Sequence, residues 1–149
     1  LGLIYLQREK FIKAEAIFIK LIELEPRNAL FYSNLGLSLY NQDKLLEAKQ
    51  AYEQAVKLEP KESRLLSLGQ VCVDRSNFKE AVNHFSKALE MNPKNTELYF
   101  YIADLLIKIQ AFNEAKAYIN TYLDEKPYSA RAKDKLREIK IASKESPLS

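Results

Sequence analysis

The amino-acid sequence predicts an all-α protein made of helical hairpins stacked side by side. The first observation is a repeat, because four of the five prolines are spaced by 34, 33 and 34 residues. The second is a set of small residues in register with these prolines. The third is that no segment shows the period-two alternation typical of strands. A fixed period of this length is typical of arrays in which each hairpin buries its apolar face against its neighbours.

Four kinds of position recur in register along the chain. The repeated prolines are Pro26, Pro60, Pro93 and Pro127, and a small residue stands 24 positions before each, at Gly2, Gly36, Gly69 and Ala103. An alanine follows each small residue after 12 positions, at Ala14, Ala48, Ala81 and Ala115. A large apolar side chain follows four positions later, at Phe18, Tyr52, Phe85 and Ile119. All three glycines of the chain obey this single register.

The clearest unit shows what each position does. Gly36 lies in an apolar helical segment, where glycine costs about 1 kcal/mol relative to alanine, so we expect a second helix to approach its backbone closely. Tyr52 would fill the space at that crossing, and Ala48 and Ala55 would keep the second helix thin. Pro60 cannot continue a helix and therefore ends the unit.

The 3.6-residue periodicity places the helices. The first helices of the pairs are expected at 1–8, 28–41, 63–74 and 95–108, the second helices at 10–24, 44–58, 77–91 and 111–124, and a last helix at 129–142. Asn28, Asn95 and Ser129 are good N-cap residues for the helices that follow them. We expect one domain over 1–143, with repeats at about 1–28, 29–61, 62–95 and 96–129, a capping helix at 129–142 and a tail at 144–149.

Composition excludes several classes of protein. With 47% hydrophobic and 29% charged residues, the chain has the balance of an ordered globular protein. It lacks an apolar run of the roughly 20 residues that span a bilayer, so no membrane insertion is expected. One cysteine, Cys72, allows neither an internal disulfide nor a cysteine metal cluster. The chain starts at Leu1 and its one methionine is Met91, so we expect the natural N-terminus to be missing.

These residues resemble the tetratricopeptide repeat family over nearly the whole chain. The unit Ala29 to Pro60 carries, in the family's order, Tyr32, Leu35, Gly36, Leu39, Ala48, Tyr52, Ala55 and Pro60. The next two units repeat this order. The first unit lacks the opening positions and begins with Leu1, Gly2 and Tyr5. A glycine that the family often places between the two helices is replaced by Glu9, Asp43, Ser76 and Gln110.

The resemblance implies a right-handed superhelix, or α-solenoid, whose concave face is lined mainly by the first helices. It also implies that the last helix is a cap, with Lys133, Lys135, Arg137 and Lys140 facing away from its apolar stripe. Leu1, Leu3 and Ile4 at the other end have no such cover. We therefore expect that end to contact an earlier repeat or a partner.

The positions of the concave groove that packing does not require are the expected binding site. They are Leu3, Asn34, Leu37, Tyr40, Asn41, Leu66, Gln70, Asp74, Phe100, Tyr101, Asp104 and Lys108. Among them the apolar and aromatic members would form an exposed patch of the kind that marks interaction sites. The alternative is that a tightly curled superhelix packs these side chains on one another.

Some family members hold an acidic peptide C-terminus with lysine, arginine and asparagine on the first helices. At the corresponding positions of this chain only Asn34 survives and the cations are gone, so that role is not expected. An amide such as that of Asn34 can still bind an extended peptide backbone, because it both donates and accepts hydrogen bonds.

The sequence gives little indication of catalysis or of metal binding. His84, the one histidine, is expected as a surface residue of a second helix, and Cys72 as an inert buried thiol. No phosphate-binding loop and no His/Cys metal spacing is found, so we expect no catalytic residue, no metal and no cofactor. Asp74 and Asp104 could approach each other as a carboxylate pair, although isolated groove acids are usually solvated or matched to a basic partner.

The net charge of +3 comes from the C-terminal segment 126–149, which carries seven Lys/Arg against three Asp/Glu. This segment could bind nucleic acid, but interspersed acids favour a solvated outer helix face, so no nucleic-acid partner is expected. The sequence thus predicts a non-enzymatic module that binds a partner peptide or helix in its groove. The alternatives are a scaffold that self-associates through its N-terminal repeat and an accessory domain of a larger enzyme. We expect a cytoplasmic protein, with the periplasm as the alternative.

Overall fold

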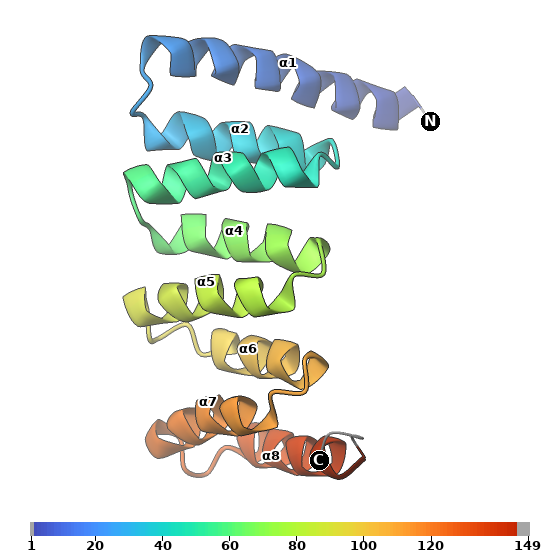
Figure 1. The fold of residues 1–149 in the computed structure, drawn as a ribbon, viewed down its shortest axis with the longest axis vertical. Coiled ribbons are helices and arrows are strands. Elements are labelled where there is room, and N and C mark those ends of the chain that lie inside the picture. Colours follow the sequence, from blue (N-terminus) through green and yellow to red (C-terminus); the bar gives the residue numbers. More distant parts are fainter. Residues whose placement is uncertain (1, 146–149) are drawn as a thin grey trace. The chain divides into compact units, whose positions relative to one another are not determined.

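The computed structural model describes the backbone of residues 2–145 and the side chains of residues 7–145. Over this range the chain forms helices and turns, with no strand, as predicted (Figure 1). The helices fall into two compact units, within residues 1–76 and 77–149. None of the described helices is long and apolar enough to cross a membrane.

The first unit contains four helices that pack in chain order. They are α1 (Gly2–Leu24), α2 (Ala29–Asn41), α3 (Leu45–Leu58) and α4 (Glu62–Asp74), each in contact with the next. Leu39, Tyr52, Leu68 and Val71 form the centre of the core, where each is at most 5% exposed. The three helices α2–α4 repeat the first-helix and second-helix alternation that the proline spacing predicts.

The second unit contains α5 (Phe78–Met91), α6 (Glu97–Lys108), α7 (Phe112–Glu125) and α8 (Ala130–Glu145). Helix α6 packs on α5 and α7, while α8 contacts both α7 and α6. Ile102, Leu106, Ile119 and Ile139 are fully buried here. These helices begin and end within a few residues of the predicted bounds.

Two of the three predicted N-caps are confirmed. The side chain of Asn28 accepts hydrogen bonds from the amides of Leu30 and Phe31, and the Ser129 hydroxyl accepts one from the amide of Ala132. The third prediction is wrong, because α6 begins later than expected and its N-cap is Thr96 rather than Asn95.

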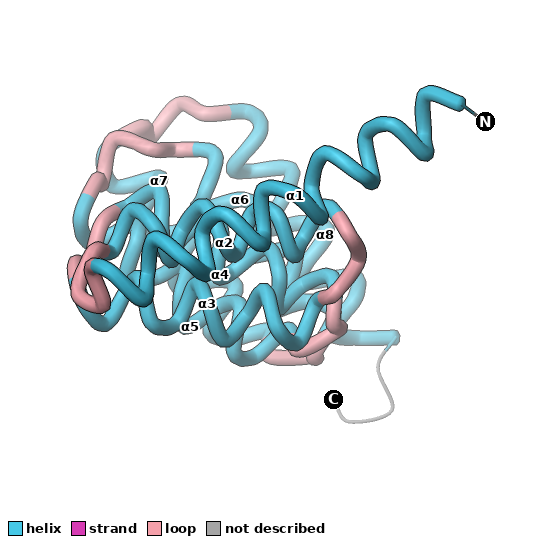
Figure 2. Tube along the Cα trace, turned by 90° about the horizontal axis from the view of Figure 1, so that it is seen from above, coloured by secondary structure: helices cyan, strands magenta, loops and turns pink. Residues whose placement is uncertain are grey.

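The predicted break between helices 1–8 and 10–24 is also wrong. Helix α1 runs without interruption from Gly2 to Leu24, and its first turns project past the other helices of this unit (Figure 2). The stretch from Gln7 to Lys10 consists of strong helix formers. A turn at Glu9 would need a left-handed residue, which costs an ordinary side chain about 1–2 kcal/mol, and only packing of a folded-back helix could offset that cost.

The other inter-helix turns do adopt that conformation. Asp43, Ser76 and Gln110 have φ values of 62°, 59° and 60°, at the three remaining positions where the family often has glycine. The sequence change from glycine therefore leaves these turns intact and adds local strain.

The close crossing predicted at Gly36 is confirmed. A Cβ atom at this position would lie 2.8 Å from the Tyr52 ring, closer than van der Waals contact permits. Tyr52 is itself 4% exposed and packed in the core, so its ring has little room to move away.

Candidate functional site

The first unit carries a groove between α2 and α4, which we call the α2–α4 groove. It is a depression of about 270 Å³ lined by Leu30, Ser33, Asn34, Leu37, Tyr52, Lys61, Ser63, Arg64 and Ser67. Leu30 and Leu37 stand on α2 with 55% and 49% of their surface exposed. Two half-exposed leucines beside polar groups give this groove the mixed character of a peptide-binding surface.

Asn34 stands inside this groove with a free side chain. Its backbone carbonyl accepts a hydrogen bond from the Ser38 hydroxyl at 2.9 Å, but its amide group bonds to none of the described side chains. An amide offers both a donor and an acceptor. Asn34 can therefore pair with the N–H and C=O groups of an incoming backbone.

Beyond the lining of the groove, the C-terminal end of α4 is acidic. The Tyr40 hydroxyl donates a hydrogen bond to the Asp74 carboxylate, which also accepts one from the Gln70 amide at 3.0 Å. The Asn41 amide donates to the Leu37 carbonyl oxygen at 2.8 Å. The bond between Tyr40 and Asp74 joins α2 to α4 next to the groove, and Asp74 is exposed.

The other end is basic. Arg64 is 7% exposed, and its guanidinium donates to the Ser33 hydroxyl at 3.0 Å and to the Glu59 carbonyl oxygen at 2.9 Å. Lys61 Nζ lies 3.3 Å from the Glu59 carboxylate, and the hydrogen bond from Lys61 lowers the pKa of Glu59. The two charged residues that line the depression, Lys61 and Arg64, are both cations.

Tyr52 forms the floor between these ends. Burial raises the pKa of its phenol to about 12, against the opposing effect of a hydrogen bond with Ser67. The phenol therefore stays neutral at physiological pH and acts as a hydrogen-bonding group, not as a base.

The predicted groove residues of the second unit have a different environment. Phe100 is 3% exposed: its ring packs edge-on against Tyr122, with centroids 5.0 Å apart, and the Arg131 guanidinium lies 3.9 Å above it. The expectation that Phe100 belongs to an exposed patch is therefore corrected. Tyr101 is half-buried with its ring 5.1 Å from that of Phe85, and Lys108 lies 5.1 Å from the Phe78 ring.

Helix α8 supplies basic side chains to this face. Arg131 forms a two-pronged contact with the Glu97 carboxylate at 2.7 and 3.0 Å, which lowers the pKa of Glu97. Lys135 Nζ lies 2.8 Å from both Asp104 and Glu138, and its side chain is only 16% exposed. Lys135 thus faces α6, contrary to the expectation that it faces away, because Asp104 offers it a partner.

The predicted site residues therefore divide by unit. Asn34, Leu37, Tyr40, Asn41, Gln70 and Asp74 lie along α2 and α4, with Leu66 half-buried on α4. Tyr101, Asp104 and Lys108 lie on α6, beside the buried Phe100. Leu3 lies outside the described side chains, as do Leu1 and Ile4. Sequence reasoning missed Arg64, whose place at the start of α4 gave no groove signal, and the contribution of α8.

The two other residues considered for chemistry, Cys72 and His84, lie on α4 and α5. Cys72 is completely buried, as predicted. His84 is not the surface residue expected, because its side chain is 14% exposed and lies 3.7 Å from Glu80 on the same helix.

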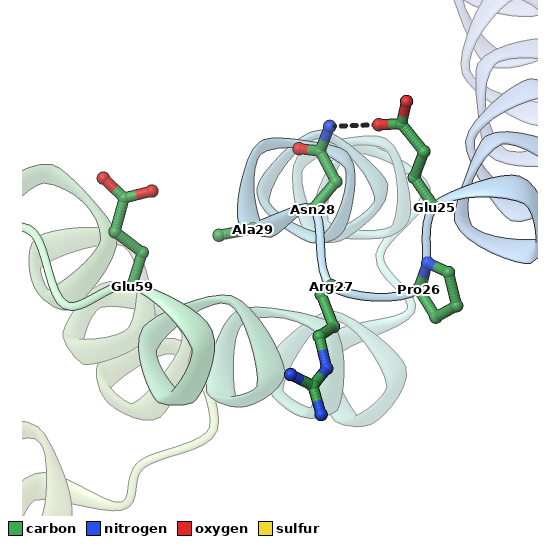
Figure 3. Close-up of a pocket in the computed structure, with 6 residues that line it drawn as sticks. All are labelled: Glu25, Pro26, Arg27, Asn28, Ala29 and Glu59. Atoms are coloured by element: carbon green, nitrogen blue, oxygen red, sulfur yellow. Dashed lines mark hydrogen bonds between the residues drawn. The ribbon is translucent and has the colours of Figure 1, made fainter.

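A second depression lies at the turn from α1 to α2 and is lined by Glu25, Pro26, Arg27, Asn28, Ala29 and Glu59. Figure 3 shows the Asn28 amide turned toward Glu25, to which it donates a hydrogen bond of 2.9 Å, while Arg27 points away from both. The Asn28 oxygen caps α2 at the same time. Both ends of this amide are thus used by the turn itself, so we assign the depression no ligand.

Helix α1 presents an uncovered apolar face. In the 34-residue register Ile17 corresponds to Ala51, yet Ile17 is 56% exposed and Ala51 is 7% exposed. Leu24, at the end of α1, is 80% exposed. Helix α2 covers Ala51 on α3, whereas no described helix covers the same face of α1.

Comparisons with known proteins agree with this architecture. Three models described as tetratricopeptide repeat match residues 1–28, 29–62 and 73–139. The chain belongs to the tetratricopeptide repeat family. The match over 1–28 treats as one repeat the segment that forms the single helix α1.

Individual relatives of this tetratricopeptide repeat protein are longer. The peroxisomal targeting signal receptor of Candida albicans is 32% identical over 93 residues, which is 62% of this chain and 16% of the receptor. The pilus assembly protein PilF of Pseudomonas aeruginosa is 29% identical over 122 residues, 80% of this chain and 48% of PilF. The chain thus spans less than half the length of either relative.

Solved structures share the fold. YrrB, described as a tetratricopeptide repeat protein with an unusual peptide-binding site, superposes with a TM-score of 0.74 at 22% identity, over 93% of this chain and 72% of YrrB. At this level of identity the likeness concerns the arrangement of the helices.

Proposed function

We propose that this tetratricopeptide repeat protein binds a partner protein by accommodating a peptide segment in the α2–α4 groove. The observation that carries the proposal is the half-buried Asn34 amide without a partner, placed between the exposed side chains of Leu30 and Leu37. An amide both donates and accepts hydrogen bonds, so a ligand backbone can take the place of water at Asn34. Flanking leucines supply the apolar contact that a peptide side chain buries on binding.

The proposal also draws on what the relatives' names state. One relative is named a targeting signal receptor, and one solved structure is described as having a peptide-binding site. The groove side chains offer hydrogen bonding and apolar contact, and Tyr52 is too weak an acid to act at neutral pH. A non-catalytic binding role and a cytoplasmic location remain our predictions for this chain.

The test compares groove variants with a matched surface variant. Asn34→Ala and Leu37→Ala should reduce recovery of partner proteins from a lysate of the source cell about tenfold or more, as expected when an interface hot spot is truncated. Leu46→Ala removes another half-exposed leucine, on α3 and outside the groove, and should change nothing. Equal binding by all three variants would show that the groove is not the site.

A second candidate function is self-association through α1, favoured by the exposure of Ile17 and Leu24. Exposed apolar faces on repeat ends are usually covered by another surface. Ile17→Lys should abolish any rise in sedimentation coefficient with protein concentration. If wild-type chain sediments as a monomer at every concentration, this candidate fails while the groove proposal stands.

A further inference from the structure

Charges of opposite sign lie at the two ends of α4. Lys61, the N-cap of α4, and Arg64 line the α2–α4 groove, whereas Asp74 ends α4 beyond that lining and accepts a hydrogen bond from Tyr40 of α2. Between them the groove is neutral, because its lining consists of serines, Asn34, Tyr52 and the two leucines. The charge pattern is therefore that of a bipolar channel, not that of a uniformly basic or acidic patch.

We propose that the groove selects an extended segment that carries an acidic side chain at the Lys61 end and a basic side chain at the Asp74 end. This inference rests on the proposed function and names the chemical class of its ligand. An extended segment fits better than a helix, because the free Asn34 amide needs unpaired backbone groups and a helix has already paired its own.

The separation of the charges follows from helix geometry. Thirteen residues separate Lys61 from Asp74, which is about 20 Å along α4 at 1.5 Å per residue. An extended strand covers that distance in about six residues at roughly 3.3 Å each. The two ligand charges should therefore stand about six positions apart, with apolar residues between them to contact Leu37.

The charged groups at both ends already have partners within the protein, and a ligand would compete with these partners or add to them. Glu59 holds Lys61 at 3.3 Å and Arg64 at 3.4 Å, so an incoming carboxylate competes with Glu59. Asp74 is fixed by Tyr40 and Gln70 but remains exposed. At physiological ionic strength the screening length is about 8 Å, shorter than the groove, so the two ends should act independently.

The experiment is a double-mutant cycle between chain and peptide. The probe is an end-blocked, fluorescein-labelled peptide of sequence Asp-Val-Leu-Thr-Val-Thr-Lys, with one version in which asparagine replaces the aspartate and another in which norleucine replaces the lysine. Affinity is measured by fluorescence anisotropy for wild type, Lys61→Gln and Asp74→Asn. Lys57→Gln and Glu53→Gln on α3 make the same charge changes outside the groove lining and serve as matched controls.

We expect Lys61→Gln to couple with the peptide aspartate and Asp74→Asn with the peptide lysine, each by about two- to fivefold in affinity, the range of partly exposed ion pairs. The crossed pairs should show no coupling. Glu59→Gln should strengthen binding of the parent peptide by a similar factor, because it releases Lys61 and Arg64 for the ligand.

The outcomes separate this inference from the proposed function. If Asn34→Ala weakens peptide binding but neither charged pair shows coupling, the groove binds peptides and the charge selection is wrong. If the peptide binds wild type and Asn34→Ala equally, or binds neither, both proposals fail. Coupling of equal size with the α3 control variants would also overturn the inference, since it would show only a general charge effect.

Discussion

The two units use the same hairpin architecture and treat the corresponding face of their first helices in opposite ways. In the first unit this face is an open groove with exposed Leu37 and an unpaired Asn34 amide. In the second unit, side chains of α8 cover this face. Arg131 lies over Phe100 and binds Glu97, and Lys135 binds Asp104. A side chain available to a partner in one unit is thus a structural contact in the other. The groove residues differ as well as their partners: in the repeat register Ser33 corresponds to Phe100 and Leu37 to Asp104, and α8 carries Lys135 as the partner of Asp104.

The largest expected effect comes from truncating a buried groove residue, Phe100, and is compared with truncation of the exposed Leu37. Phe100→Ala should lower the free energy of unfolding by about 3–5 kcal/mol, as for other buried aromatic truncations, because its ring packs between Tyr122 and Arg131. Leu37→Ala should cost less than about 0.5 kcal/mol, since Leu37 is half exposed. Urea denaturation followed by circular dichroism measures both. Similar costs for the two variants would contradict the contrast between the units.

The helix crossings offer a second comparison. Gly36→Ala should destabilise the protein by about 1–3 kcal/mol, because the new Cβ would meet the Tyr52 ring at 2.8 Å. The second unit has Ala103 and Ile119 at the corresponding positions, and both are fully buried. Ala103→Gly should therefore cost only the helix penalty of glycine, about 1 kcal/mol. Thermal melts of the two variants give the values, and a stabilised Gly36→Ala protein would show that Tyr52 has room to shift.

The contribution of Arg131 to the packing of α8 on α6 can be tested by removing its guanidinium group. Arg131→Gln should increase amide hydrogen exchange in α8 and leave exchange in α2 and α3 unchanged, because Arg131 joins α8 to both Glu97 and Phe100. Arg137→Gln is the matched control, since Arg137 pairs only with Asp134 of its own helix. Faster exchange in both variants would indicate that α8 responds to total charge alone.

The smallest expected effect is a loss of hydrogen-exchange protection in α8 at acid pH. The hydrogen bond from Arg131 lowers the pKa of Glu97 below 4.5. A group with a depressed folded-state pKa contributes stability above its unfolded-state value and loses it as the pH falls through the folded-state value. Protection of α8 should therefore be constant from pH 7 to pH 5 and decrease below about pH 4.5, with a smaller decrease in Glu97→Gln. A decrease of the same size in both proteins would assign it to other carboxylates.

Sequence reasoning located most of the fold and, of the nine residues that line the groove, Asn34 and Leu37. The proline and glycine register was sufficient for α2 to α8, because each position answers a local requirement: a helix end at Pro60 or a close crossing at Gly36. It was also sufficient for Asn34 and Leu37, which the same register places on the groove face. It failed at Glu9, where strong helix formers continue α1 through the expected turn.

The amino-acid sequence by itself determined the hairpin period, the bounds of α2 to α8 to within a few residues and the close approach of Tyr52 to Gly36, because periodicity and side-chain size act over short stretches of chain. Tertiary structure alone decided which groove residues face solvent. Phe100 and Lys135 were assigned to the wrong environments because the exposure of each depends on a helix some thirty residues away. Arg131 of α8 covers Phe100, and Asp104 of α6 binds Lys135. Arg64 entered the site for the same reason: its hydrogen bond to Ser33 forms only when α4 lies beside α2.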